Sequence, residues 1–310
     1  MDPFIVCLWI MLVSCAVAWM LSLVTGDTSW VDRSWSVLPP VYAWVFAAGS
    51  GFHDERLIMI AVLVTLWGAR LTFNFARKGG YAPGGEDYRW AVLRERMSPR
   101  SFGLFTLFFI TIYQNVILLL IVLPAGTAAL HAATPFGPAD LVLALVFLLL
   151  LVGEGVADQE QWNFHLNRQP VTAAGGTAPA TTKTAGAAGP DVLRTGLFRY
   201  SRHPNYFCEL GQWWVVFLFG AVAAGSLVQW TVLGAVLLTG LFIGSTVFTE
   251  RISVSRHPGY PAYQRVTSPI VPWFPRVDPQ SVPRSSGQDS RRARPGAVLP
   301  PASHPVRKGR

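Results

Sequence analysis

The chain has 310 residues, of which 51% are hydrophobic and 14% are charged, and its formal net charge is +8. Soluble domains usually carry a charge on about a quarter of their residues, so this composition excludes an ordinary water-soluble fold. The positive charge does not indicate nucleic-acid binding, because the basic residues lie in loops between apolar stretches and in a Pro/Ser-rich tail, and not on one soluble face.

Seven stretches approach the roughly 20 apolar residues that cross a bilayer as a helix. In chain order they are 4–24, 35–52, 57–76, 102–123, 139–157, 207–224 and 227–248. We therefore expect an all-α, polytopic membrane helix bundle of about seven transmembrane helices, which covers residues 1–276. An Ala/Gly/Thr-rich segment at 171–190 is expected to be a flexible insertion, and the basic tail at 277–310 is expected to be disordered.

Lys and Arg are concentrated in alternate loops along the chain. They are frequent in 76–101, in 158–204 and from Arg251 onward, whereas the loops between these segments contain only Arg56. By the positive-inside rule, this predicts an N-terminus outside and a C-terminus in the cytosol. The expected location is the cell membrane, with the lipid bilayer as partner and the active face cytoplasmic; the oligomeric state is left open.

The three cysteines predict neither a disulfide framework nor a metal site. Cys7, Cys15 and Cys208 all lie in or beside apolar stretches and form no CxxC pair. We therefore expect no metal or redox role for them.

Polar side chains recur at helical spacing within the apolar stretches. Three sets share one helix face each: Arg70, Asn74 and Arg77; Glu154, Asp158, Gln161 and His165; Asn205, Glu209 and Gln212. The fourth long stretch adds Thr111 and Gln114. Any single set can be explained by hydrogen bonds between helices. Together, on the side of the basic loops, they predict a polar cavity open to the cytosol that can admit a charged cofactor.

The segment 201–206 reads SRHPNY and leads into the sixth apolar stretch. Pro204 suits the first turn of a helix, so Arg199, Arg202 and His203 are expected just before a helix N-terminus, where phosphate or carboxylate can bind. The alternative is a basic cluster that only anchors the helix at the membrane surface.

A second cluster follows the last apolar stretch and contains Tyr260, Tyr263 and Arg265. These side chains can close over a nucleotide by stacking and charge, or they can pack at the level of the lipid headgroups. The residue pattern alone leaves both interpretations open.

Five segments carry a resemblance to a known family. They are WVDRSW at 30–35, LWGARL at 66–71, GEDYR at 85–89, TGLFRYSRHPNY at 195–206 with Glu209, and GYPAYQRVTS at 259–268. The chain resembles a bacterial membrane family of uncharacterised proteins related to steroid 5-alpha-reductases, whose cofactor region corresponds to residues 139–276 here. His165 departs from the Lys or Arg of the relatives.

The resemblance implies an NADPH-dependent oxidoreductase that transfers hydride to an activated C=C bond of a lipid-soluble enone, sterol-like or isoprenoid-like. By position, it implies cofactor contacts from Asp158, Arg199, Arg202, His203, Asn205, Tyr206, Glu209, Tyr260, Tyr263 and Arg265. Reduction of an enone needs a hydrogen-bond donor where oxyanion charge develops. The catalytic candidates for this role are Tyr88, Tyr81, Asp32 and Glu86.

Two other functions compete with the reductase. The Arg-His-Pro motif before a helical Glu also resembles membrane methyltransferases of the isoprenylcysteine carboxyl type, which use S-adenosylmethionine. Those enzymes show a Glu-Glu pair after the last membrane helix, whereas here Glu250 is followed by Arg251. A non-enzymatic transporter or receptor is the second alternative, although transport favours polar groups near the membrane midplane.

Overall fold

The structure is a computed structural model that describes residues 1–82, 84–168 and 191–277. The predicted flexible insertion and all but the first residue of the predicted tail lie outside these residues. Within the described part there are helices and no strand. The helices are α1 (Pro3–Thr25), α2 (Trp30–Ser34), α3 (Leu38–Gly49), α4 (Glu55–Arg77), α5 (Tyr88–Arg96), α6 (Pro99–Phe105), η1 (Thr106–Tyr113), α7 (Gln114–Leu120), α8 (Leu123–Leu130), α9 (Pro138–Arg168), η2 (Gly196–Arg199), α10 (Pro204–Ala224), α11 (Val232–Arg256) and α12 (Tyr260–Val266).

The expected all-α membrane bundle is confirmed. Six described segments are long and apolar enough to cross a membrane: α1, α4, the run from α6 to α8, α9, α10 and α11. The second expected stretch, 35–52, instead bends after α2 and forms the 12-residue helix α3. At 1.5 Å per residue, α3 is about 18 Å long, which is shorter than the ~30 Å hydrocarbon core. Pro39 sets its start, because proline lacks an N–H and fits the first helical turn.

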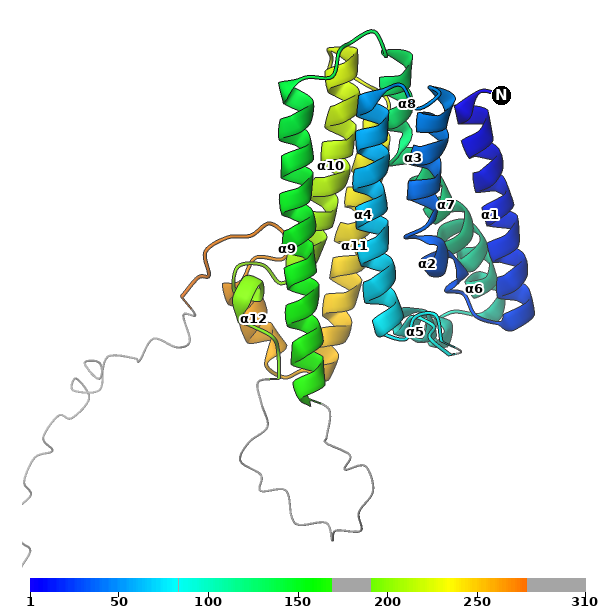
Figure 1. The fold of residues 1–310 in the computed structure, drawn as a ribbon. Coiled ribbons are helices and arrows are strands. Elements are labelled where there is room, and N and C mark those ends of the chain that lie inside the picture. The colour runs from blue at the N-terminus through cyan, green and yellow to red at the C-terminus, as the bar shows by residue number, and fades with distance from the viewer. Residues whose placement is uncertain (83, 169–190, 278–310) are drawn as a thin grey trace, which may run out of the picture. The chain divides into compact units, whose positions relative to one another are not determined.

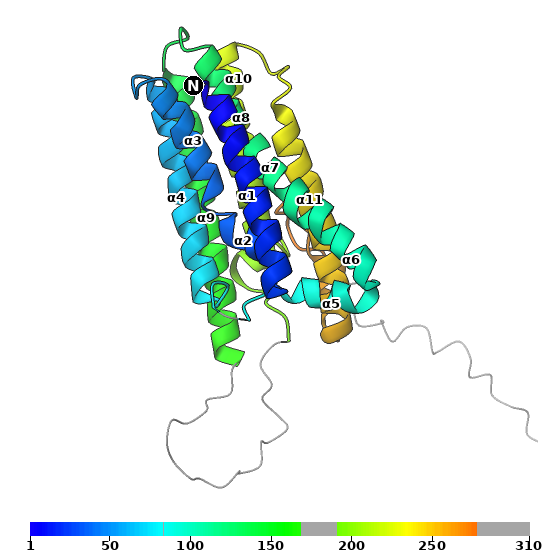
Figure 2. The same cartoon turned by 90° about the vertical axis from the view of Figure 1, so that its right-hand side faces the viewer.

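The loops divide between the two ends of the bundle. Figure 1 shows that α1 begins at the end where α3 joins α4, α8 joins α9 and α10 joins α11. We call this the closed end. The opposite end carries α5, α12 and the basic loops, and we call it the basic end. A view turned by 90° shows the same division (Figure 2). The described parts of the loops that the sequence groups by charge therefore lie together in space.

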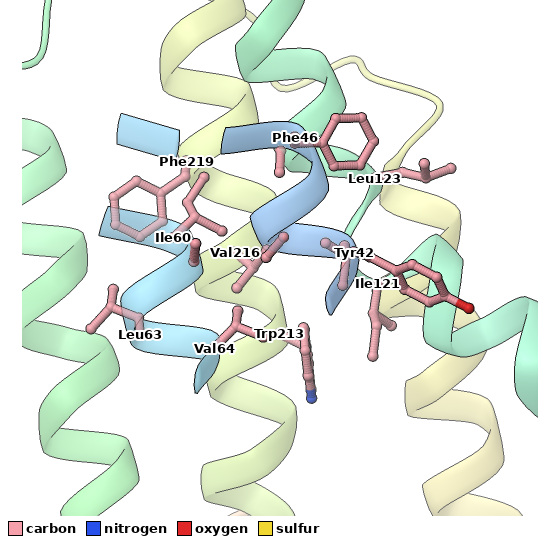
Figure 3. Packing of buried hydrophobic residues seen from close by; sticks show 14 of the residues in the cluster. Tyr42, Phe46, Ile60, Leu63, Val64, Ile121, Leu123, Trp213, Val216 and Phe219 are labelled. Atoms are coloured by element: carbon pink, nitrogen blue, oxygen red, sulfur yellow. The ribbon is translucent and has the colours of Figure 1, made fainter. Parts of the chain in front are cut away.

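The hydrophobic core fills the half of the bundle near the closed end. Figure 3 shows Ile60 and Val64 of α4 packed among Tyr42 of α3 and Val216 of α10. Trp67 and Trp213 meet edge to face with ring centroids 4.7 Å apart and are both nearly inaccessible to solvent. Apart from the first two residues of α4, the charged residues of these helices lie in the other half of the bundle, around the cavity.

A buried ion pair joins α4 to α9 at the closed end. Arg56 is 1% exposed and donates to both carboxylate oxygens of Asp140, at 2.6 and 2.8 Å. Its remaining N–H groups donate to the carbonyl oxygens of Thr134 and Pro135. Arg56, which the sequence analysis counted with the loops at this end, therefore has a structural role as the partner of α9. Its charge does not report on topology.

Candidate functional site

A cavity of about 1180 Å³ occupies the half of the bundle near the basic end. Its polar wall comes from α4, α9 and α10 and consists of Arg70, Asn74, Lys78, Glu154, Asp158, Gln161, His203, Asn205 and Glu209. Its apolar wall comes from α6, η1, α11 and the turn after α2 and consists of Trp35, Phe105, Phe109, Tyr113, Gly240, Leu241, Gly244 and Phe248. Side chains of α5, the end of α11 and α12 complete the lining at the basic end. Two chemically different surfaces therefore face one chamber.

Arg70 is the centre of the polar wall. Its guanidinium pairs with Asp158 and lies 2.7 Å from the Glu154 carboxylate. Gln212 donates to the same Glu154 side chain at 2.7 Å. Glu209 is 7% exposed and interacts electrostatically with Arg70. The polar stripes predicted on three helices therefore face one another, with three carboxylates around one arginine.

The SRHPNY motif ties the start of α10 to the C-terminal segment. α10 begins at Pro204, as predicted. Arg202 forms an ion pair with Glu250 at 2.6 Å and also donates to the carbonyl oxygens of Gln264 and Thr267. His203 lies 3.1 Å from the carbonyl oxygen of Pro269. The Arg202 side chain is thus largely committed to protein partners, although it also lines the cavity.

His203 and Tyr206 form one edge of the polar wall. Their rings stack with centroids 5.2 Å apart, and Tyr206 meets Phe242 edge to face at 4.7 Å. Burial lowers the pKa of His203, although Glu250 opposes this effect. The imidazole at this edge is therefore neutral over a wider pH range than a free histidine.

Two tyrosines of α12 line the cavity at the basic end. Tyr260 and Tyr263 are buried, and their rings meet edge to face at 5.9 Å. The Tyr263 hydroxyl donates to the carbonyl oxygen of Phe198. Burial raises the pKa of both tyrosines. By contrast, Arg199 and Arg265 are exposed and lie outside the cavity lining.

The four catalytic candidates separate into two pairs. Asp32 and Tyr88 line the cavity. Asp32 accepts a hydrogen bond from the Trp90 indole at 3.1 Å, and burial raises the pKa of its carboxyl group. The guanidinium carbon of Arg256 lies 5.3 Å from the centre of the Tyr88 ring.

Tyr81 and Glu86 lie outside the cavity lining. The Tyr81 hydroxyl donates to the carbonyl oxygen of Arg33 at 3.4 Å. Glu86 accepts from Thr28 and forms an ion pair with Arg94 at 2.7 Å. Burial opposes ionisation of Glu86, but the bonds from Arg94 and Thr28 lower its pKa overall. Both side chains thus have protein partners in or beside α2 and α5.

The sequence prediction missed several residues of the site. Arg89 donates to Ser245 of α11 at 2.7 Å and so holds α5 beneath the cavity. The sequence did point to Arg89, because it is the last residue of the GEDYR segment that carries the family resemblance. Lys78 also lines the cavity, beyond the last residue of the predicted stripe on α4. The apolar wall was missed altogether, because its side chains do not stand out in a membrane helix.

The chain belongs to a family described as "Protein of unknown function (DUF1295)", whose pattern matches residues 18–267. Among its relatives is an uncharacterized protein of Schizosaccharomyces pombe, which is 38% identical over 281 residues, 89% of this chain and 81% of the relative. No solved structure gives a significant match. The matched span includes the polar wall, α5 and the tyrosines of α12. Membership in a family that extends to a fungus does not support the restriction to bacteria that we expected.

Proposed function

We propose that this protein is a membrane-embedded NADPH-dependent reductase that acts on an activated C=C bond of a lipid-soluble enone, as its resemblance to steroid 5-alpha-reductases implies. The observation that carries the proposal is the single cavity with one charged wall and one aromatic, glycine-lined wall. An enzyme that brings an anionic, water-soluble cofactor to a lipid needs both surfaces in one chamber.

The cavity fits NADPH well. Its volume exceeds the range of about 300–1,000 Å³ typical of pockets for one small ligand, so a dinucleotide and part of a lipid fit together. Lys78 and Arg256 line it. Among the described residues, Lys78 donates to the Gln161 amide and interacts with Asp158 only at longer range. Arg256 lies over the Tyr88 ring. Cationic groups of this kind bind phosphate, which NADPH has and S-adenosylmethionine lacks.

The polar wall supplies partners for the rest of the cofactor. Asn205 and Glu209 lie one helical turn apart on α10, and Asp158 faces them from α9. Their amide and carboxylate groups suit ribose hydroxyls and a carboxamide. Tyr260 and Tyr263 supply aromatic rings near the phosphate end. NADPH, when bound, supplies the hydride.

Asp32 and Tyr88 are the proposed proton and hydrogen-bond donors. Reduction of an enone adds hydride to the β-carbon and a proton to the α-carbon, while negative charge develops on the carbonyl oxygen. Burial raises the pKa of Asp32, which keeps its proton available closer to neutral pH. The Tyr88 hydroxyl can donate to the carbonyl oxygen. Tyr81 and Glu86 are second choices, because both have protein partners outside the cavity.

The first test is thermal unfolding of detergent-purified protein with NADPH, NADH or S-adenosylmethionine. A ligand at 100 times its Kd stabilises a protein by ~2.7 kcal/mol. We expect stabilisation by NADPH, and its loss in the double variant Lys78→Gln/Arg256→Gln. The matched control is Arg265→Gln, which removes an exposed charge outside the cavity. No stabilisation by any of the three would favour the non-enzymatic alternative.

One observation favours the methyltransferase. Glu154, Asp158 and Glu209 surround Arg70, and carboxyl groups that outnumber the guanidinium suit a cationic sulfonium group. Stabilisation by S-adenosylmethionine alone would replace the reductase with this second candidate.

A further inference from the structure

The apolar wall contains a stack of three aromatic rings, one at the end of α6 and two on η1. Phe105, Phe109 and Tyr113 are spaced four residues apart, and successive rings stack with centroids 4.9 and 5.3 Å apart. η1 is a π-helix of eight residues, a rare element that frequently marks functional sites. All three rings line the cavity. The result is a column of stacked aromatic rings along one side of the cavity.

α11 presents glycines to the same cavity. A methyl group on Gly234 would lie 2.3 Å from the carbonyl oxygen of Leu120, so α11 touches α7 closely near the closed end. A methyl group on Gly240 or Gly244 would meet nothing within 4 Å. Both glycines are exposed and line the cavity. α11 and the α6–α7 helix separate toward the basic end, as Figure 1 shows. The cavity lies between them, since residues of both line it.

Gln114 lies at the end of this space. It directly follows Tyr113, lines the cavity and is 5% exposed. Among the described residues, no hydrogen bond involves its side-chain amide. Its amide atoms are not among the fully buried polar atoms, so they are accessible from the cavity and can bind a polar group of a ligand there. An amide can donate two hydrogen bonds and accept others.

We propose that the space between the rings of Phe105 and Phe109 and the glycines of α11 binds the hydrocarbon body of a lipid ketone, whose carbonyl oxygen accepts a hydrogen bond from Gln114 in addition to the one proposed from Tyr88. We call this space the lipid slot and define it by Phe105, Phe109, Gly240, Gly244 and Gln114. The lipid reaches the slot sideways from the bilayer, between η1 and α11. This inference rests on the proposed function, for which it names the substrate position and the residues that set specificity.

The test is photolabelling of the purified full-length protein with a diazirine-bearing 4-en-3-one sterol, followed by peptide mapping. Labelling is expected in residues 105–114 and 240–249. Gly244→Leu fills the slot and should reduce labelling at least tenfold, while leucine favours a helix more than glycine does. Gly155→Leu is the matched control, because Gly155 also has open space around it but lies outside the cavity lining. Absent labelling, labelling confined to other segments, or labelling unchanged in Gly244→Leu would overturn the slot.

A second variant tests the polar contact. Gln114→Leu keeps the size of the side chain and removes the amide, so it should weaken labelling by the ketone about tenfold. Labelling by the matched sterol hydrocarbon without the oxygen should not change. Equal losses for both probes would overturn the role of Gln114.

NADPH stabilisation, measured on the same samples, separates this inference from the proposed function. Labelling in the slot without stabilisation by NADPH would reject the reductase and keep the slot. Stabilisation by NADPH without labelling would keep the reductase and reject the slot.

Discussion

Arginines at the cavity differ in what surrounds them. Arg202 is matched by one carboxylate and two carbonyl oxygens, so its charge and its donors are satisfied by the protein. Arg70 instead faces three carboxylates. We interpret Arg202 as a residue that positions α10 against the C-terminal segment. Around Arg70, by contrast, the carboxyl groups outnumber the guanidinium.

Asp32 gives a prediction at the scale of one residue. Its pKa is raised by burial, so the protonated form is favoured by folding; this contribution to stability is complete below the ordinary pKa of aspartate and is lost as the pH rises through the raised value. If Asp32 is the acid, turnover falls over the same pH range. Asp32→Asn should lower turnover about 100-fold or more and remove this limb of the pH profile.

The measurement is the rate of NADPH oxidation with a 4-en-3-one sterol as a function of pH, with NADPH stabilisation as the control for folding. A variant with full turnover and an unchanged profile would transfer the role to Tyr88.

At the scale of the elements, α11 packs closely against a neighbouring helix in one half and borders the cavity in the other. Gly234 allows close contact with α7, and Gly240 and Gly244 leave space beside η1. α4, α9 and α10 are divided in the same way. Their residues near the closed end pack in the hydrophobic core, and their polar stripes near the basic end line the cavity. Each long helix thus combines a packing half and a site half.

This division gives a matched pair of variants. Gly234→Leu should destabilise the protein by about 1–3 kcal/mol, because its side chain collides with the backbone of Leu120. Gly240→Leu should cost no stability. Melting temperatures of both variants in detergent check the prediction; equal values for the two would show that the contact between α11 and α7 is not close.

Local patterns predicted the long helices and the polar stripes, because hydropathy and i, i+4 spacing belong to single segments. They did not predict the break between α2 and α3, where Pro39 set a helix start inside an apolar run. The pairing of Arg202 with Glu250 joins residues 48 positions apart and depends on tertiary structure. The rings of Phe105, Phe109 and Tyr113 were missed although they are spaced four residues apart, because aromatic side chains are ordinary in an apolar membrane segment.

At the scale of the whole molecule, the basic loops meet at one end of the bundle, and we propose that this end faces the cytosol. Two cysteine substitutions test the orientation. Ser226 lies in the connection between α10 and α11, and Ser255 lies near the end of α11; both are exposed. A membrane-impermeant maleimide should label Ser226→Cys on intact cells and Ser255→Cys only after permeabilisation. The reverse pattern would invert the topology.

The closed end has a further consequence for the barrier that the membrane provides. Arg56 and Asp140 lock α4 to α9 there, Gly234 brings α11 onto α7, and the apolar core fills the space between the helices. Ligands can therefore enter and leave at the basic end, or from the side, without opening a path between the two aqueous compartments. A cell that makes this protein in quantity should therefore keep its ion gradients.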